Sequence, residues 1–470
     1  MLSMPHMFDK YFICDESFKN VVDDGQVVGF QIGVKVSYYR GVVLGIVNDM
    51  RVTVDGQTYG KKDMTFNVKA GSFTFEQMVG RDDVRWDFGE VAYLHIKKPG
   101  GLAEGRHSVR VFEEIRIVNG MEIPPVMFVA EDEKELELNG CYELPAKIKR
   151  AISFYSFQDE LYLGKMDAEG MIRATAEMGA EGVEIISEAI IPNFPNPPES
   201  WVNQWFEWMD KYHVKPVAFD MFMDGQLYDG VDIPDDRAVE ILETNIKLAS
   251  RMGFKVLRVV YTIPLRIVER ALPCAERYNV VMGIELHPPF RLCTPQVDQY
   301  VDFIKRTNTK YFSLIPDFGI FTRSVVPFHE EKAIRGGADE ATVKLISRCY
   351  AERMSYDEML GRIKDMNPGE KELAWAKTAY SYTYCDPELL SHYIPYISHV
   401  HAKVLDMRDG IDPSVDNETI FRVLKENGWS GYVATEYEGQ RIFHDQWDRD
   451  VDNLGIIRAN QEMMQRYIDA

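Results

Sequence analysis

Cysteine is scarce in this chain, and none of the arrangements in which cysteines usually act together is present. Only six of the 470 residues are cysteines, and they lie far apart without a Cys-x-x-Cys pair. This spacing argues against a zinc ribbon, a dithiol redox motif and a disulfide framework. Reduced thiols are typical of the cytoplasm, so we expect a cytoplasmic protein.

Basic residues and long apolar runs are also few. The chain carries 53 Lys and Arg against 74 Asp and Glu, a formal net charge of −21 at pH 7. Binding to phosphate backbones depends on cations, so we expect neither nucleic acid nor an anionic membrane as a partner. No apolar run is long enough to span a bilayer, and residues 1–7 lack the basic and apolar regions of a signal peptide.

The first part of the chain has the pattern of a β-rich domain. Between residues 8 and 138, short runs that alternate apolar and polar residues are separated by turn signals such as Asp55-Gly56. Several short strands at regular spacing predict an all-β sandwich. An acidic stretch followed by Asn139-Gly140 indicates its exit, so we place the sandwich at residues 1–145. This part shows no catalytic cluster, which predicts a non-catalytic module.

From residue 146 onward, apolar runs alternate with amphipathic helical patterns. Eight runs are predicted as strands: residues 151–157, 182–187, 215–223, 256–263, 280–287, 312–321, 397–404 and 432–437. Eight strand–helix units predict a (β/α)₈ barrel over residues 146–470. The stretch 329–396 is too long for one connection and predicts an insertion, which could be a lid, extra packing on the outer helices or a subunit contact.

Four successive strands of this barrel end in carboxylate or imidazole side chains. The fifth strand carries Glu285, and the next three deliver Asp317, His401 and Glu436. Each one alone would more often cap a helix or pair with a cation. Barrels place their chemistry at the C-terminal ends of the strands, however, so we expect the four to meet. Such oxygen and nitrogen donors suit a divalent cation, with Mn²⁺ as the first choice and Mg²⁺ or Co²⁺ as alternatives.

Two parts of the chain resemble known families. Residues 176–185 and 399–403 resemble the xylose-isomerase-like sugar isomerases and epimerases, a resemblance that covers the barrel. Residues 8–13, 17–22 and 28–32 resemble the small β subunit of bacterial C-glycoside deglycosidases. The barrel resembles their α subunit, in which the metal-site strand carries Glu-x-His. The chain would then be a fusion of parts usually encoded separately, which leaves its subunit contacts open.

The resemblance implies a small-molecule substrate, a glycoside already oxidised to a ketone at sugar C3 by a separate oxidoreductase. Such a ketone acidifies the C2 proton, and the enolate left after its removal can expel the aglycone from C1. The implied activity is a metal-dependent lyase of 3-oxo-C-glycosides, with 3-oxo-O-glycosides open, that gives a 1,5-anhydro-hex-1-en-3-ulose. We also expect a homo-oligomer.

Two residues are predicted to be catalytic. His287 lies two residues beyond Glu285 on the same side of the strand. It would take the C2 proton, because histidine exchanges protons near neutral pH; the alternative is a partner that orients Glu285. Lys403 lies two residues beyond His401 and would hydrogen-bond a sugar hydroxyl or the enolate, or would instead pair with Glu436.

Other polar residues near the predicted strand ends are expected to bind the sugar. These substrate-binding candidates are Tyr261, Asp220, Glu438 and Arg441. Glu184 belongs either with them or in the barrel interior, because it lies early in its strand.

Two further classes of function stay open. A metal-dependent sugar isomerase or epimerase would use the same metal site and proceed through an enediolate. A non-enzymatic sugar-binding or assembly protein would make the four-residue pattern a coincidence. A DNA-repair endonuclease on the same barrel is disfavoured by the net charge.

Overall fold

The computed structural model describes residues 8–23, 25–117, 126–144, 147–440 and 451–470. The chain divides into two units, Met1–Ala146 and Lys147–Ala470. The first is rich in strands, and the second alternates strands with helices around a parallel barrel. The predicted fold class is confirmed. None of the helices in the described ranges has both the length and the apolar character needed to cross a membrane.

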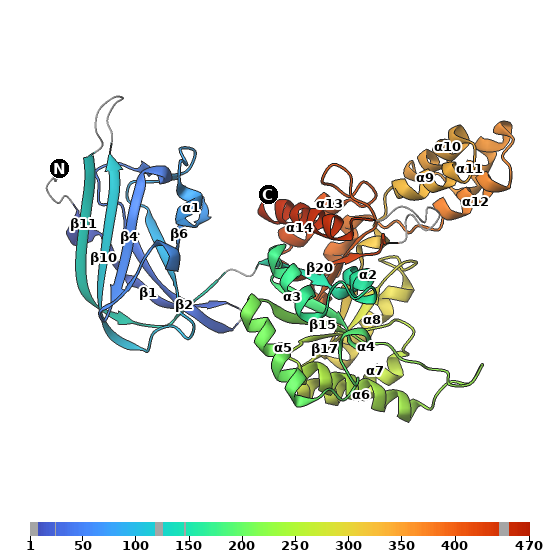
Figure 1. The fold of residues 1–470 in the computed structure, drawn as a ribbon, viewed down its shortest axis with the longest axis horizontal. Helices are drawn as coiled ribbons and strands as arrows, with labels where there is room; N and C mark the ends of the chain where they lie inside the picture. The colour runs from blue at the N-terminus through green and yellow to red at the C-terminus, as the bar shows by residue number, and fades with distance from the viewer. Residues whose placement is uncertain (1–7, 24, 118–125, 145–146, 441–450) are drawn as a thin grey trace. The chain divides into compact units, whose positions relative to one another are not determined.

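The N-terminal unit consists mainly of two sheets (Figure 1). The six-stranded sheet has the order β12 (Cys141–Glu143), β1 (Ile13–Asp23), β2 (Gln26–Lys35), β9 (Val91–Lys97), β6 (Met64–Val68) and β7 (Gly71–Phe73). The four-stranded sheet has the order β11 (Val126–Leu138), β10 (Gly105–Ile117), β4 (Val47–Val54) and β5 (Gln57–Tyr59). A short pair, β3 (Val42–Val43) and β8 (Arg85–Trp86), and the helix α1 (Phe75–Met78) complete the unit.

The two sheets share one hydrophobic core, because their strands alternate between buried and outward-facing residues. In β10, for example, Val109, Val111 and Ile115 are fully buried. The predicted turn at Asp55-Gly56 joins β4 and β5, and both residues adopt positive φ angles, 47° and 84°. Such angles are typical of tight hairpin turns, which explains the Asp-Gly sequence.

The C-terminal unit contains an eight-stranded parallel sheet. In chain order the strands are β13 (Ile148–Ser153), β14 (Gly182–Ile186), β15 (Lys215–Asp220), β16 (Val256–Val259), β17 (Val281–Leu286), β18 (Phe312–Pro316), β19 (Val400–Val404) and β20 (Gly431–Tyr437). The sheet order runs from β18 back to β13 and then through β20 to β19. Two isolated parallel bridges, Leu314 to Ile397 and Asp317 to His401, link β18 with β19. The barrel is therefore nearly closed.

Helices follow the strands on the outside of the barrel (Figure 1). They are α2 (Gln158–Tyr162), α3 (Ala168–Glu177), α4 (Ser187–Ile190), α5 (Glu199–Tyr212), α6 (Asp235–Arg251), α7 (Leu265–Tyr278), α8 (Pro295–Thr307), α13 (Asn417–Glu426) and α14 (Asn453–Asp469). Their apolar faces and the strands form one large core. This arrangement leaves the ends of the strands as the place where polar side chains can meet.

Several strands end earlier than predicted. The run 312–321 was expected to be one strand, but β18 stops at Pro316 and a 3₁₀ turn, η5 (Phe318–Ile320), follows. Asp317 caps this turn, since its Oδ1 accepts a hydrogen bond from the Gly319 amide at 2.6 Å. The turn is as buried as the strand, so the apolar pattern continued across the true strand end.

The predicted insertion is a group of four helices, α9 (Pro327–Arg335), α10 (Glu340–Ala351), α11 (Tyr356–Ile363) and α12 (Glu370–Ala379), with a hydrophobic core of its own (Figure 1). A capping box at Ser355 begins α11, and Asn367, which follows that helix, adopts a positive φ of 57°. The Tyr350 hydroxyl donates to the Thr322 carbonyl, 2.8 Å away. This contact attaches the insertion to the segment that follows β18.

Candidate metal centre

Glu285, Asp317, His401 and Glu436 come together in the barrel. One donor atom from each of the four lies within 4.8 Å of the others. Each side chain is almost fully enclosed by protein. The four residues predicted from the sequence thus lie together in the structure. Their role as metal ligands stays a prediction.

The strand positions explain why the four side chains meet. Glu285 is the last but one residue of β17, and Glu436 has the same place in β20. Asp317 directly follows β18, and His401 lies opposite it in β19 through the bridge that nearly closes the barrel. Parallel strands bring equivalent ends together, so residues far apart in sequence share one site.

His401 contacts the other donors through its Nδ1 atom. This nitrogen lies 3.0 Å from Glu285 Oε1 and 3.6 Å from Glu436 Oε2. Burial alone would lower the pKa of His401, but the carboxylates of Glu184 and Glu436 raise it well above its usual value. Burial would likewise raise the pKa of Glu285, but the hydrogen bond and charge of His401 hold it below its usual value. The site therefore favours the charged forms of both groups.

Lys403 brings a positive charge to the same carboxylates. Its Nζ atom lies 3.0 Å from Asp317 Oδ2, 3.2 Å from Glu436 Oε2 and 3.0 Å from Glu438 Oε1. Burial opposes the charge, but these carboxylates raise the pKa of Lys403 well above its usual value. The pairing with Glu436 that the sequence left as an alternative is present, since the two residues are also register partners in β19 and β20.

The oxygens of this group fit a divalent cation. Asp317 Oδ2 and Glu436 Oε2 are buried, and their contacts with Lys403 Nζ are ion pairs; among the described residues neither oxygen has a partner with hydrogen-bond geometry. Burial raises the pKa of Asp317 to about 7, and the charges of Glu436 and Glu285 add to this effect against that of Lys403. A bound cation would relieve the repulsion among the carboxylates and favour their ionised forms.

His287 lies just beyond the end of β17 and is partly exposed. Its Nδ1 lies 2.7 Å from the carbonyl oxygen of Pro288. A carbonyl only accepts, so Nδ1 carries the hydrogen and a neutral ring has its lone pair on Nε2. The ring is thus held in the tautomer in which Nε2 could accept a proton.

Arg258 is a site residue that the sequence analysis missed. It lies in β16 and is 6% exposed, with Nε 3.3 Å from Asp220 Oδ1 and 3.7 Å from Glu285 Oε2. Its guanidinium also lies over the Phe222 ring, 4.8 Å from the ring centroid. An arginine inside the apolar run of a buried strand was the signal that could have revealed it.

The remaining predicted residues differ in their surroundings. Asp220 is 1% exposed and paired with Arg258. Tyr261 is 45% exposed and packs edge-on against Phe290, with ring centroids 5.1 Å apart. Glu438 directly follows β20 and pairs with Lys403. The contacts predicted between these three residues and a sugar stay predictions.

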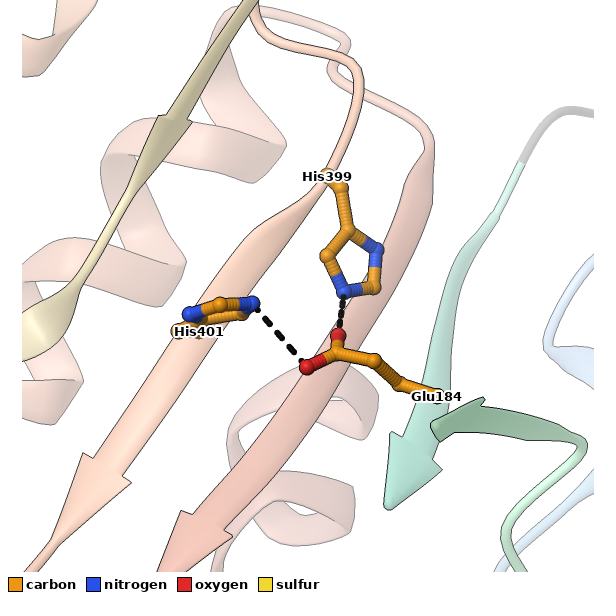
Figure 2. Close-up of side chains that lie close together, drawn as sticks. All are labelled: Glu184, His399 and His401. Atoms are coloured by element: carbon orange, nitrogen blue, oxygen red, sulfur yellow. Dashed lines mark hydrogen bonds and ion pairs between the residues drawn. The ribbon is translucent and has the colours of Figure 1, made fainter. Parts of the chain in front are cut away.

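Two further residues, Arg441 and Glu184, were predicted to lie near strand ends. Arg441 lies outside the residues that the structure describes. Glu184, for which two places were open, lies in the barrel interior and is fully buried. Its carboxylate contacts both His399 and His401 (Figure 2).

Comparison with known proteins agrees with this division of the chain. Residues 8–118 match the family C-glycoside deglycosidase beta subunit, and residues 172–322 match the xylose isomerase-like TIM barrel family. Among solved structures, L-ribulose 3-epimerase aligns with a TM-score of 0.41 and 13% identity, over 68% of this chain and 95% of that one.

Relatives are known for both units. The C-glycoside deglycosidase beta subunit of Eubacterium cellulosolvens is 35% identical over 103 residues, which are 22% of this chain and 70% of that protein. The 3′-dehydrocarminate deglycosidase alpha subunit of a Microbacterium species is 23% identical over 342 residues, which are 67% of this chain and 94% of that protein. The chain therefore belongs to the C-glycoside deglycosidases, with a β-subunit-like domain and an α-subunit-like barrel in one polypeptide.

Proposed function

We propose that this chain is a metal-dependent lyase that releases the aglycone from glycosides carrying a ketone at sugar C3. The observation that carries the proposal is the group Glu285, Asp317, His401 and Glu436, with His287 at the end of the same strand as Glu285. The name of the Microbacterium relative, which specifies a 3′-dehydro substrate, supports the oxidised position. A separate oxidoreductase would supply this ketone.

The donor set favours Mn²⁺, with Mg²⁺ or Co²⁺ as alternatives, because three carboxylates and one imidazole are typical ligands of such ions. When bound, the cation would act as a Lewis acid that polarises the C3 ketone. Glu285, Asp317 and Glu436 would hold it through oxygen atoms, and His401 through Nδ1, the nitrogen that faces them.

His287 would act as the general base. Its Nε2 atom takes the proton from C2, and the electron pair of the C2–H bond forms an enolate with the C3 carbonyl. The enolate then collapses: the C3 carbonyl reforms, a C1–C2 double bond forms, and the bond from C1 to the aglycone breaks. The aglycone leaves with that electron pair and takes up a proton. The products are the aglycone and a 1,5-anhydro-hex-1-en-3-ulose, and the step involves no net oxidation.

Lys403 would stabilise negative charge on the substrate. Its ammonium group lies among Asp317, Glu436 and Glu438. A donor held in place where charge develops on an oxygen stabilises the transition state more than the ground state. We propose that Tyr261, Asp220 and Glu438 bind sugar hydroxyls around this centre.

The direct test is to incubate the protein with Mn²⁺ and a 3-oxo-C-glycoside and to follow release of the aglycone by chromatography. The proposal predicts release that stops after chelation and returns when Mn²⁺ is added. The parent glycoside without the ketone is the matched control and should not react, because its C2 proton is not acidic. Equal release from metal-free protein would contradict the metal requirement. A 3-oxo-O-glycoside in parallel reports the linkage preference.

The alternative is a sugar isomerase or epimerase that forms an enediolate with the same metal. Such an enzyme commonly needs an acid/base group on each face of the sugar. Free aldoses and ketoses should therefore be assayed beside the 3-oxo-glycoside. Interconversion of free sugars without release of an aglycone would favour the alternative.

A further inference from the structure

Three buried side chains form a cluster next to the proposed metal site. Glu184 lies in β14, His401 in β19, and His399 directly before β19. His399 is 1% exposed and the other two are fully buried. His399 Nε2 lies 2.5 Å from Glu184 Oε2, and His401 Nε2 lies 3.2 Å from Glu184 Oε1. Figure 2 shows both imidazole rings directed at this one carboxylate.

His401 is therefore in contact with carboxylates on both sides. Its Nδ1 faces Glu285 and Glu436, which belong to the four-donor group, whereas its Nε2 faces Glu184. The 3.2 Å contact between His401 Nε2 and Glu184 Oε1 is an ion pair without hydrogen-bond geometry. An ionised carboxylate carries only lone pairs, and a second lone pair on Nε2 would repel them at this distance, so Nε2 carries the hydrogen. The hydrogen on Nδ1 is the one that a cation would replace, because Nδ1 faces the other donors.

We infer that Glu184 is a positioning residue, which keeps the hydrogen of His401 on Nε2 and directs the Nδ1 lone pair toward the cation. His399 holds the other oxygen of the same carboxylate. Histidine ligands of metals commonly donate their second nitrogen to a carboxylate in this way, and removal of that partner typically lowers metal affinity about 10–100-fold. The inference rests on the metal site of the proposed function.

One donor atom from each of these three residues also lies within 4.8 Å of the others, so the cluster could in principle hold a metal ion itself. Two donors bound to one ion at about 2.1 Å lie roughly 3 Å apart or more in tetrahedral and octahedral geometry. The 2.5 Å separation of His399 Nε2 and Glu184 Oε2 is too short for that and corresponds to a charge-assisted hydrogen bond. We therefore assign the cluster to support of His401.

The test measures Mn²⁺ affinity of the full chain by competition with a chelating dye. Glu184→Ala should bind Mn²⁺ about 10–100-fold more weakly than wild type. Glu184→Gln should bind within a few-fold of wild type, because its amide oxygen can accept from His401 Nε2–H while its amide hydrogens point to His399. Asp412→Asn is the matched control, since Asp412 is also buried but bonds to Ser414, and it should leave the affinity unchanged.

Each outcome bears on the inference. The inference is overturned if Glu184→Ala binds Mn²⁺ as tightly as wild type. It is also overturned if Glu184→Gln loses as much affinity as Glu184→Ala, because that result would show that the charge of Glu184 matters and the position of the His401 hydrogen does not. Two Mn²⁺ ions per chain in wild type would also overturn it, because the cluster would then bind metal itself. A wild-type chain that binds no divalent cation would instead overturn the metal site of the proposed function.

A spectroscopic measurement decides the question even if Glu184→Ala does not fold. Nitrogen-15 NMR of histidine-labelled wild-type protein, loaded with diamagnetic Mg²⁺, reports which ring nitrogen carries a hydrogen. The signals of His401 are identified by their loss in His401→Gln. The inference predicts a hydrogen on Nε2 and none on Nδ1. The opposite tautomer overturns it.

Discussion

The ammonium nitrogen of Lys403 lies 3.0 Å from Oδ2 of Asp317. A cation of the protein itself thus lies among the oxygens that we propose to bind a metal. A bound ion and Lys403 would share the same carboxylates, so the charge of Lys403 should weaken metal binding slightly and be available to an oxygen of the substrate.

Replacement of Lys403 separates these two effects. In Lys403→Met, the affinity for Mn²⁺ should be equal to or higher than in wild type, because a competing positive charge is gone. Release of the aglycone should fall about 10-fold or more, because a donor to the developing negative charge is lost. Mn²⁺ titration and steady-state kinetics measure the two quantities. Lys425→Met, on the outer helix α13, is the control. Loss of metal binding in Lys403→Met would show that the lysine organises the ligands.

Glu436 should be required for both metal binding and activity. In Glu436→Gln the side chain keeps its shape but loses the charge that attracts the cation, so Mn²⁺ content after dialysis and aglycone release should fall together. Glu438→Gln is the matched comparison, because Glu438 also pairs with Lys403 but is not part of the four-donor group. It should retain the metal. A Glu436→Gln protein that keeps full Mn²⁺ content would mean that the site is misassigned.

The helical insertion should lose stability in mild acid because of His329. Burial lowers the pKa of this residue to about 4, below the ordinary histidine value of 6.5. The unfolded chain therefore binds a proton that the folded chain does not, so stability is complete above pH 6.5 and declines as the pH falls toward 4. The decline is at most about 3 kcal/mol, and less because the ring is only partly buried.

Thermal unfolding across this pH range tests the effect. His329→Gln cannot titrate and should show a smaller drop in melting temperature between pH 7 and pH 4.5 than wild type. His392→Gln, at an exposed position, should follow wild type. Parallel curves for wild type and His329→Gln would rule out this source of acid sensitivity.

The N-terminal unit is predicted to contribute to assembly or to the surroundings of the active site, without supplying the base. The fragment 147–470 contains its own core and should fold. We propose that the full chain is a homo-oligomer and that the fragment loses activity, forms a smaller assembly, or both. Light scattering after size-exclusion chromatography and the aglycone assay measure these properties. A fragment with full activity and the same assembly would show that the N-terminal unit contributes to neither property.

The four-donor group was predictable because each of its residues can be recognised from its position in one short stretch of sequence. Each of Glu285, Asp317 and Glu436 lies at the end of an apolar run, and His401 lies inside one. The barrel rule then places strand ends together without any knowledge of side-chain contacts. The Asp55-Gly56 turn was predictable for the same reason, since only a few residues adopt its backbone angles.

The contacts around this group were not predictable from the sequence. Glu184 and His399 lie in or beside strands that are separated in the barrel by β13 and β20, so their hydrogen bond depends on how far each strand is shifted along the sheet. Arg258 pairs with Asp220 for the same reason. The predicted strands extended too far where a buried turn such as η5 continued the apolar pattern of the strand.

Proton abstraction by His287 is the central claim, and exchange of the C2 hydrogen tests it most directly. A 3-oxo-glycoside with a poor leaving group is incubated with the Mn²⁺-loaded protein in deuterated solvent, and the loss of the C2 hydrogen signal is followed by NMR. His287→Ala should keep the metal, because the imidazole is not one of the four donors, and should exchange about 10²–10⁴-fold more slowly than wild type. His392→Ala should exchange like wild type. Exchange at the wild-type rate in His287→Ala, with Mn²⁺ still bound, would contradict the account and show that another residue is the base.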